Sequence, residues 1–359
     1  MYFKEDIDKV KERLFAFWDR EIVDRACVAV WAPKKEGVNT SAFINDAQCP
    51  DEQSIIRYWT DPATIYRNNM RRLENTYLGG ECIPAVFQNY GTAGHCSYFG
   101  AKPSYGKDTI WFDPVWKSLE DADTSYDESA LEKYLAIAQF LVDRANDYYF
   151  VAMPDNCGTL DAICHLYGTE NVLVSFREEP ELLKNAIHKV NEGWKRSYEK
   201  FYKISRENCG GGSAHMWMHL LAPGRLAQMQ CDLSVMLSPA MYEEFVLPEL
   251  YEQMESIDYP VYHFDGVEQI AHLPYLLRLK KLKAIQWTYV AGQPSAAHYI
   301  HVLKRIQEAG KGLIIMAPSS DIPALMDGLS SKGLYIHTEA KDVAEAHAIE
   351  DYVKNHTKE

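Results

Sequence analysis

A histidine and an aspartate two positions apart, His263 and Asp265, are the residues of this sequence with the clearest chemical potential. They close a short apolar segment of β character, and alternate residues of a strand point to the same side, so both side chains would enter one space. A carboxylate beside an imidazole can hold a divalent metal ion or act as an acid–base pair. The same pattern also arises when a histidine hydrogen-bonds to an aspartate that caps a helix, here one starting near Val267.

Polar and aromatic residues also stand where other short apolar segments end. The set is Asn89, Asp155, Trp217, His219, Trp287 and His337. If these segments are strands that share one end, their closing side chains meet in one pocket. We expect Asp155, His219 and Asp265 to be catalytic, and Asn89, Trp217 and Trp287 to bind substrate. A structural interpretation stays open, because tryptophans often pack in cores and His215 with His219 could be a hydrogen-bonded pair on one face of a strand.

Such a pocket needs a scaffold that brings strand ends together. Eight β-prone runs alternate with stretches of helical period. The runs are residues 27–31, 83–88, 149–153, 213–218, 261–264, 284–287, 313–316 and 334–337. Eight parallel strands with intervening helices predict an α/β fold, the (β/α)8 or TIM barrel, whose active site lies at the C-terminal strand ends. A doubly wound sheet needs the same alternation, but no Gly-x-Gly-x-x-Gly follows any run.

Longer segments of helical period separate the runs or flank them. They are residues 119–147, 179–207, 239–256, 296–309 and 343–354. The first 26 residues and 38–72 are expected to be helical additions before the second strand. We therefore predict a single barrel domain over 1–359, with a helical N-terminal extension within 1–76.

Composition and charge exclude several classes of function. Lys and Arg number 37 against 51 Asp and Glu, and the resulting net charge of −14 disfavours nucleic-acid and membrane-surface partners. No apolar run is long enough for a membrane helix, and the N-terminal segment lacks the apolar core of a secretory signal. The eight cysteines include no C-x-x-C pair, so we expect reduced thiols in the cytoplasm. A phosphate-binding loop, H-E-x-x-H and G-x-S-x-G are all absent.

Several segments, in order from about Tyr77 to the C-terminus, resemble the uroporphyrinogen decarboxylase superfamily. This superfamily includes cobalamin-dependent methyltransferases that move methyl groups between corrinoid proteins and thiols. The segments are residues 77–81, 108–112, 168–171, 179–182, Asp232 with 237–239, 244–248, 263–266, and 286–288 before Gly292. The resemblance implies a (β/α)8 barrel.

The resemblance to the decarboxylases themselves is incomplete. They begin with a proline-rich stretch whose arginines bind the acetate and propionate groups of the substrate, whereas the matching strand here reads CVAVWAP at 27–33. Arg25 precedes this strand, and no further arginine replaces the missing ones. Because a substrate with eight carboxylates needs fixed cationic donors, we expect negligible turnover of uroporphyrinogen.

The corrinoid methyltransferases of this superfamily hold zinc on a His-x-Cys pair after strand five and a Cys near the last strand. The resemblance places His263, Asp265 and His337 at these positions, so we expect them to bind a divalent metal, zinc first. The expected function is methyl transfer between a small molecule and a corrinoid protein that presents cobalamin, and a homodimer is one assembly that the sequence allows. A metal-free decarboxylase, with Asp155 or Asp265 stabilising a cationic intermediate, and a non-catalytic binding protein are the alternatives.

Overall fold

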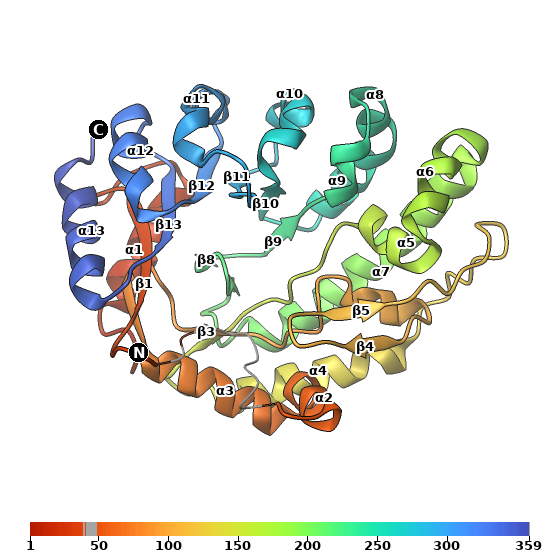
Figure 1. Cartoon of the computed structure of the whole chain (residues 1–359), viewed down its shortest axis with the longest axis horizontal. Coiled ribbons are helices and arrows are strands. Elements are labelled where there is room, and N and C mark those ends of the chain that lie inside the picture. Colours follow the sequence, from red (N-terminus) through yellow and green to blue (C-terminus); the bar gives the residue numbers. More distant parts are fainter. Residues whose placement is uncertain (39, 41–48, 359) are drawn as a thin grey trace.

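The computed structural model describes residues 1–38, 40 and 49–358, and it has an α/β fold with a large, mostly parallel sheet. Seven strands hydrogen-bond in the order β2-β1-β13-β12-β11-β10-β9, and all pairs are parallel except β1 with β2 (Figure 1). Their bounds are β1 Cys27–Pro33, β2 Thr76–Gly80, β9 Leu226–Met229, β10 Tyr259–Phe264, β11 Ala284–Trp287, β12 Gly312–Met316 and β13 Leu334–Glu339. The sheet therefore supplies adjacent parallel strand ends, as the proposed pocket requires.

The remaining strands are short and form three separate pairs. These are β3 Ala85–Val86 with β6 Phe150–Val151, β4 Pro103–Tyr105 with β5 Ile110–Phe112, and β7 Ser213–His215 with β8 Leu220–Ala222. Only the first pair is parallel. Within the described residues, strand hydrogen bonds do not close the sheet into the expected eight-stranded barrel.

The run at 213–218 is not the parallel strand that the sequence predicts. Its first half is β7, and residues 216–219 form a turn that leads back into the antiparallel β8. His219 ends this turn with φ of +48°, a left-handed conformation that few residues other than glycine adopt. The parallel neighbour of β10 is instead β9, a run absent from the sequence prediction. His215, Trp217 and His219 consequently do not share one strand face.

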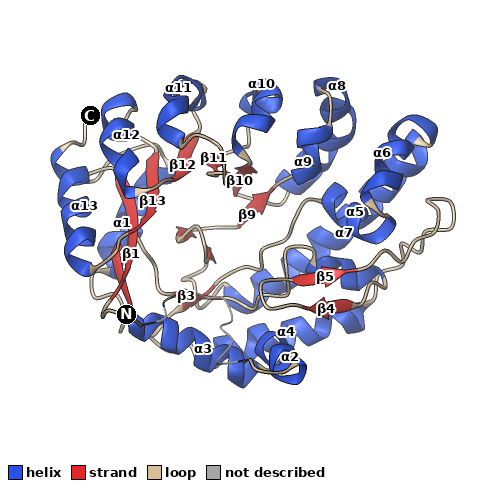
Figure 2. Ribbon diagram, viewed as in Figure 1, coloured by secondary structure: helices blue, strands red, loops and turns tan. Residues whose placement is uncertain are grey.

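Helices cover the outside of the strands (Figure 2). Their bounds are α1 Ile7–Trp18, α2 Glu52–Thr60, α3 Pro62–Asn75, α4 Glu128–Val142, α5 Thr159–Tyr167, α6 Thr169–Glu178, α7 Pro180–Ser205, α8 Pro239–Met241, α9 Leu247–Met254, α10 Leu273–Arg278, α11 Ile300–Glu308, α12 Ile322–Gly328 and α13 Val343–Asn355. Four of the five helical segments expected between and after the strands contain a helix with narrower bounds, and the fifth, 343–354, ends one residue before α13 does. The N-terminal additions contain α1, α2 and the start of α3, while 39 and 41–48 lie outside the described residues. No helix within the described ranges is long and apolar enough to cross a membrane.

Side chains alternate between the two faces of each strand, and this alternation divides the buried core into two clusters. Val261, Ala284 and Tyr335 belong to an inner cluster that draws residues from strands on all sides and from α1. Phe264 and Trp287 belong to an outer cluster between the strands and the surrounding helices. Because successive side chains of a strand point to opposite faces, His263, Gln286 and His337 face the inner side. The candidate site is therefore built on the inner face.

Candidate functional site

Asp232, His263 and Asp265 come together at the ends of two neighbouring parallel strands. Asp232 follows β9, His263 lies in β10 and Asp265 follows β10. One potential ligand atom from each residue lies within 4.8 Å of the other two, and His263 Nε2 is 3.2 Å from Asp265 Oδ1. One imidazole and two carboxylates are a workable ligand set for a divalent cation.

Gln286, on the adjacent strand β11, orients the His263 ring. Its Oε1 is 2.5 Å from His263 Nδ1, and its Nε2 donates to Thr288 Oγ1 at 2.9 Å. Because an amide oxygen only accepts, Nδ1 carries the proton and Nε2 faces Asp265. Burial lowers the pKa of His263, but Asp265 and Gln286 outweigh this effect and raise it to about 9. Metal-binding histidines are commonly held in one tautomer by such a bond to the second nitrogen.

A third carboxylate, Asp161 in the first turn of α5, supports the cluster from behind. Its oxygens accept the backbone N–H groups of Asp232 and Leu233, each at 2.9 Å. Burial raises the pKa of Asp161 to about 6, against the effect of these bonds. Burial of the carboxyl group and the charges of Asp161 and Asp265 also raise the pKa of Asp232. The cluster thus holds more negative charge than one imidazolium neutralises, and a divalent cation would relieve this repulsion.

A cavity of about 620 Å³ lies beside this cluster. Five of the expected site residues line it: Asn89, Asp155, Trp217, His219 and His337. Trp217 connects cavity and cluster, because its Nε1 donates to Asp155 Oδ2 at 3.0 Å and its ring meets that of His263 edge-on at 5.6 Å. Asp155 Oδ1 is buried and has no hydrogen-bond partner among the described residues. Burial raises the pKa of Asp155, although the charge of His263 and the Trp217 bond oppose it.

Three buried histidines lie on the other side of the cavity or just behind its wall. The rings of His219 and His337 are 5.1 Å apart, and Trp31 packs against His337 at 4.5 Å. His219 Nδ1 donates to the Ile83 carbonyl at 3.2 Å, whereas both ring nitrogens of His215 and of His337 are buried without a described partner. Burial lowers the pKa of His215 and His219 to about 3 and that of His337 well below its usual value. All three imidazoles are therefore neutral.

The structure groups the expected metal-binding residues differently from the sequence prediction. His337 is not in a three-ligand group with His263 and Asp265; among the described residues that group is completed by Asp232. The reason is strand order, since β12 and β11 separate β13 from β10 and each strand spacing is about 4.8 Å. His337 faces the inner side as expected, but from a distant strand.

Trp287, which the sequence analysis expects to bind substrate, does not face the cavity. Its side chain is 1% exposed and packs against Phe264 at 5.5 Å and Tyr299 at 5.5 Å in the outer cluster. Alternation along β11 turns Gln286 inward and Trp287 toward the helices. The inner residue at this strand end is therefore the glutamine.

Comparisons with known proteins give a structural match and no sequence match. No family model matches the chain, and no curated protein does. A methyltransferase from Methanosarcina mazei is similar in structure, with a TM-score of 0.62 and 13% identity over 96% of this chain and 98% of that chain. A B12-independent methionine synthase from Shewanella sp. W3-18-1, in complex with selenomethionine, gives a TM-score of 0.36 and 8% identity over 72% of each chain. The first similarity shows that this chain shares the fold of that methyltransferase.

Proposed function

We propose that this chain is an enzyme of the uroporphyrinogen decarboxylase superfamily that transfers a methyl group between a small molecule and a corrinoid held by a partner protein. The transfer would take place beside a divalent metal ion bound by Asp232, His263 and Asp265. The observation that carries this proposal is the convergence of the three ligand atoms, with Gln286 fixing the His263 tautomer. The motif resemblance, which implies a (β/α)8 barrel, and the fold shared with a methyltransferase agree with it.

The ligand set fits zinc, and also iron or manganese, because it combines one nitrogen with carboxylate oxygens. When bound, the metal would act as a Lewis acid that lowers the pKa of a thiol or water at its open position. Asp161 would hold the Asp232 backbone in place, and Gln286 would keep His263 Nε2 directed at the site. Asp155 and Trp217 would orient the methyl-bearing molecule in the cavity, where neutral His219 and His337 add polar contacts without charge.

The metal proposal is tested by elemental analysis of the purified protein and two matched variants. We expect stoichiometric metal in the wild-type protein, its loss in His263→Ala, and its retention in His337→Ala, because His337 lies outside the ligand group. Loss of metal in His337→Ala but not in His263→Ala would contradict the assignment. Methyl transfer is tested separately by following the absorption spectrum of methylcobalamin with a thiol acceptor, with His263→Ala as the inactive control.

A metal-free decarboxylase is the second candidate, and Asp155 favours it. A buried carboxylate oxygen without a partner, in the wall of a cavity, could stabilise a cationic intermediate. In that case the purified protein would contain no metal and Asp155→Asn would abolish activity. Uroporphyrinogen itself remains a poor candidate, because only one arginine, Arg72, lines the cavity within the described residues.

A further inference from the structure

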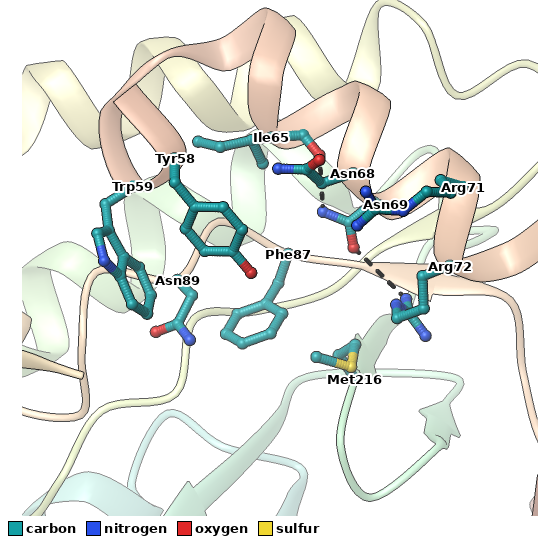
Figure 3. A pocket seen from close by; sticks show the side chains of 10 residues that line it. All are labelled: Tyr58, Trp59, Ile65, Asn68, Asn69, Arg71, Arg72, Phe87, Asn89 and Met216. Carbon is teal, nitrogen blue, oxygen red and sulfur yellow. Dashed lines mark hydrogen bonds between the residues drawn. The ribbon is translucent and has the colours of Figure 1, made fainter. Parts of the chain in front are cut away.

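Arg72, in the last turn of α3, has a buried guanidinium at the edge of the cavity. The residue is only 7% exposed. Its Nη2 donates to the Ala85 carbonyl at 2.5 Å and to Asn69 Oδ1 at 3.5 Å, and its Nε is buried with no hydrogen-bond partner among the described residues. Figure 3 shows the side chain reaching from the helix toward Met216, beside Phe87. The guanidinium thus keeps donor capacity that the protein does not use.

No acidic residue that the structure describes is a counter-ion for this charge. Across the part of the chain that the structure describes, no Asp or Glu forms an ion pair with Arg72, and no carboxylate affects its pKa. Burial lowers that pKa to about 10, so the group stays cationic at neutral pH. The other buried arginine near the sheet, Arg25, is paired with Glu81 at 2.7 Å. An unpaired buried charge is costly, which is unexpected in a chain with 51 acidic residues unless a ligand completes the pair.

The position of Arg72 indicates the kind of anion. Arg72 lines the 620 Å³ cavity and also a narrower one of about 40 Å³, and Phe87, Asn89 and Met216 line both. Among the described residues, the other charged side chains that line the larger cavity are Asp108, Asp155 and Glu339, while Arg71 lines only the narrower one. One cation among three acids suits a monoanion and disfavours a dianion such as phosphate. The planar fork of an arginine matches a carboxylate, with two parallel N–H···O bonds.

We propose that Arg72 binds the carboxylate of a small monoanionic substrate whose uncharged part lies against Phe87, Met216 and Trp217. This inference rests on the proposed function in one respect: it takes the bound carboxylate compound to be the substrate of the methyl-transfer site. The carboxylate end would be held near α3, and the remainder would extend toward Asp155 and the metal ligands.

Isothermal titration with benzoate and with its neutral analogue benzamide tests the proposal. We expect the wild-type protein to bind benzoate at least tenfold more tightly than benzamide. Arg72→Met should remove this preference, and Arg72→Lys should retain part of it. Arg67→Met, at an exposed position on the same helix, should behave as wild type and controls for the change in net charge. Equal binding of the two probes by the wild-type protein, or an unchanged preference in Arg72→Met, would overturn the proposal.

Two further measurements keep the test decisive. If Arg72→Met does not fold, two measurements still test the proposal: the benzoate preference of the wild-type protein and that of Arg72→Lys. Neither requires a protein that lacks a cation at this position. Binding of inorganic phosphate in place of benzoate would contradict the carboxylate assignment. A wild-type protein that prefers benzoate to benzamide but fails the methyl-transfer assay would reject the proposed function and leave the anion site standing.

Discussion

Trp287 and Gln286 are adjacent on β11, and their side chains lie on opposite sides of the sheet. Trp287→Ala should lower the free energy of unfolding by about 4 kcal/mol, because it removes a fully buried indole from the outer cluster. Benzoate affinity should not change. Trp217→Ala should do the reverse, with weaker benzoate binding and a smaller loss of stability, since its half-buried ring lines the cavity. Urea unfolding and calorimetry of both variants measure the two effects, and a Trp287→Ala protein with weakened binding would contradict the assignment.

At the residue scale, the alternation of side chains between the two faces of a strand decides which of the predictions from the sequence hold. His263 and Asp265 were expected on one face because they are two apart, and their 3.2 Å contact agrees with that. The same alternation rule also places Trp287. Gln286 pairs with His263 and faces the same inner side, so its neighbour Trp287 must face the outer side. That register is not readable from one sequence. Arg72 was missed for another reason, because it lies on a helix that no strand-end argument includes.

At the scale of elements, Glu249 of α9 hydrogen-bonds to the start of α5. This residue is 1% exposed; its Oε1 accepts from Thr159 N at 2.6 Å, and its Oε2 is buried without a described partner. Burial raises its pKa from 4.5 to about 8, against the effect of the Thr159 bond. Because the folded state holds the proton more tightly than the unfolded state, this group's contribution to stability is fully present below pH 4.5 and is lost as pH rises through 8.

Glu249→Gln should therefore match the wild-type stability near pH 4 and exceed it at higher pH. The expected gain is on the order of 3 kcal/mol at pH 7.5, because the amide keeps an acceptor for Thr159 and cannot ionise. Urea unfolding at several pH values measures it. Glu255→Gln, at an exposed position just after the same helix, should change stability by about 0.5 kcal/mol or less at every pH. A gain that does not depend on pH would show that ionisation is not the cause.

The elements that the sequence predicted well are those with a long, regular pattern. The helical period of 179–207 encloses α7, and that of 343–354 nearly coincides with α13. The hairpin of β7 and β8 was misassigned because its arms are only three residues each, too short for alternation to separate one strand from two. The same shortness hid β9, whose four residues follow the Pro-Gly pair at 223–224. This strand leads toward Asp232, so the missed strand also concealed a candidate metal ligand.

At the scale of the whole molecule, the candidate site depends on contacts between segments far apart in the sequence. Asp161 lies in α5, Asp232 follows β9, and His263 and Gln286 lie in β10 and β11. No local pattern specifies that they meet. The α/β class and the use of strand ends were predictable, because they follow from alternation repeated along the chain. Whether the sheet closes into a barrel was not predictable. It depends on how the short strands and the N-terminal helix fill the side opposite the candidate site.

On that opposite side, Glu81 joins several elements to one another. It is a fully buried carboxylate that follows β2. Arg25 donates to both of its oxygens at 2.7 and 2.8 Å, the Val28 N–H at the start of β1 donates at 2.7 Å, and Arg13 of α1 donates at 3.3 Å. One side chain therefore connects the N-terminal helix, the first strand and the antiparallel edge strand. Loss of its charge would leave the Arg25 guanidinium buried and unpaired.

Glu81→Gln should lower the free energy of unfolding by about 3 to 5 kcal/mol, because breaking a buried pair costs more than the pair contributes. Asp24→Asn, which removes a partner of Arg13 that is 38% exposed, should cost about 1 kcal/mol or less. Combining Glu81→Leu with Arg25→Met should cost less than the sum of the single changes, since no buried charge then remains unpaired. Urea unfolding of Glu81→Gln, Asp24→Asn, the double variant and its two single replacements measures these differences. Equal losses in Glu81→Gln and Asp24→Asn would show that the Glu81 contacts are no stronger than a surface ion pair and that the N-terminal helix is held to the sheet by apolar packing alone.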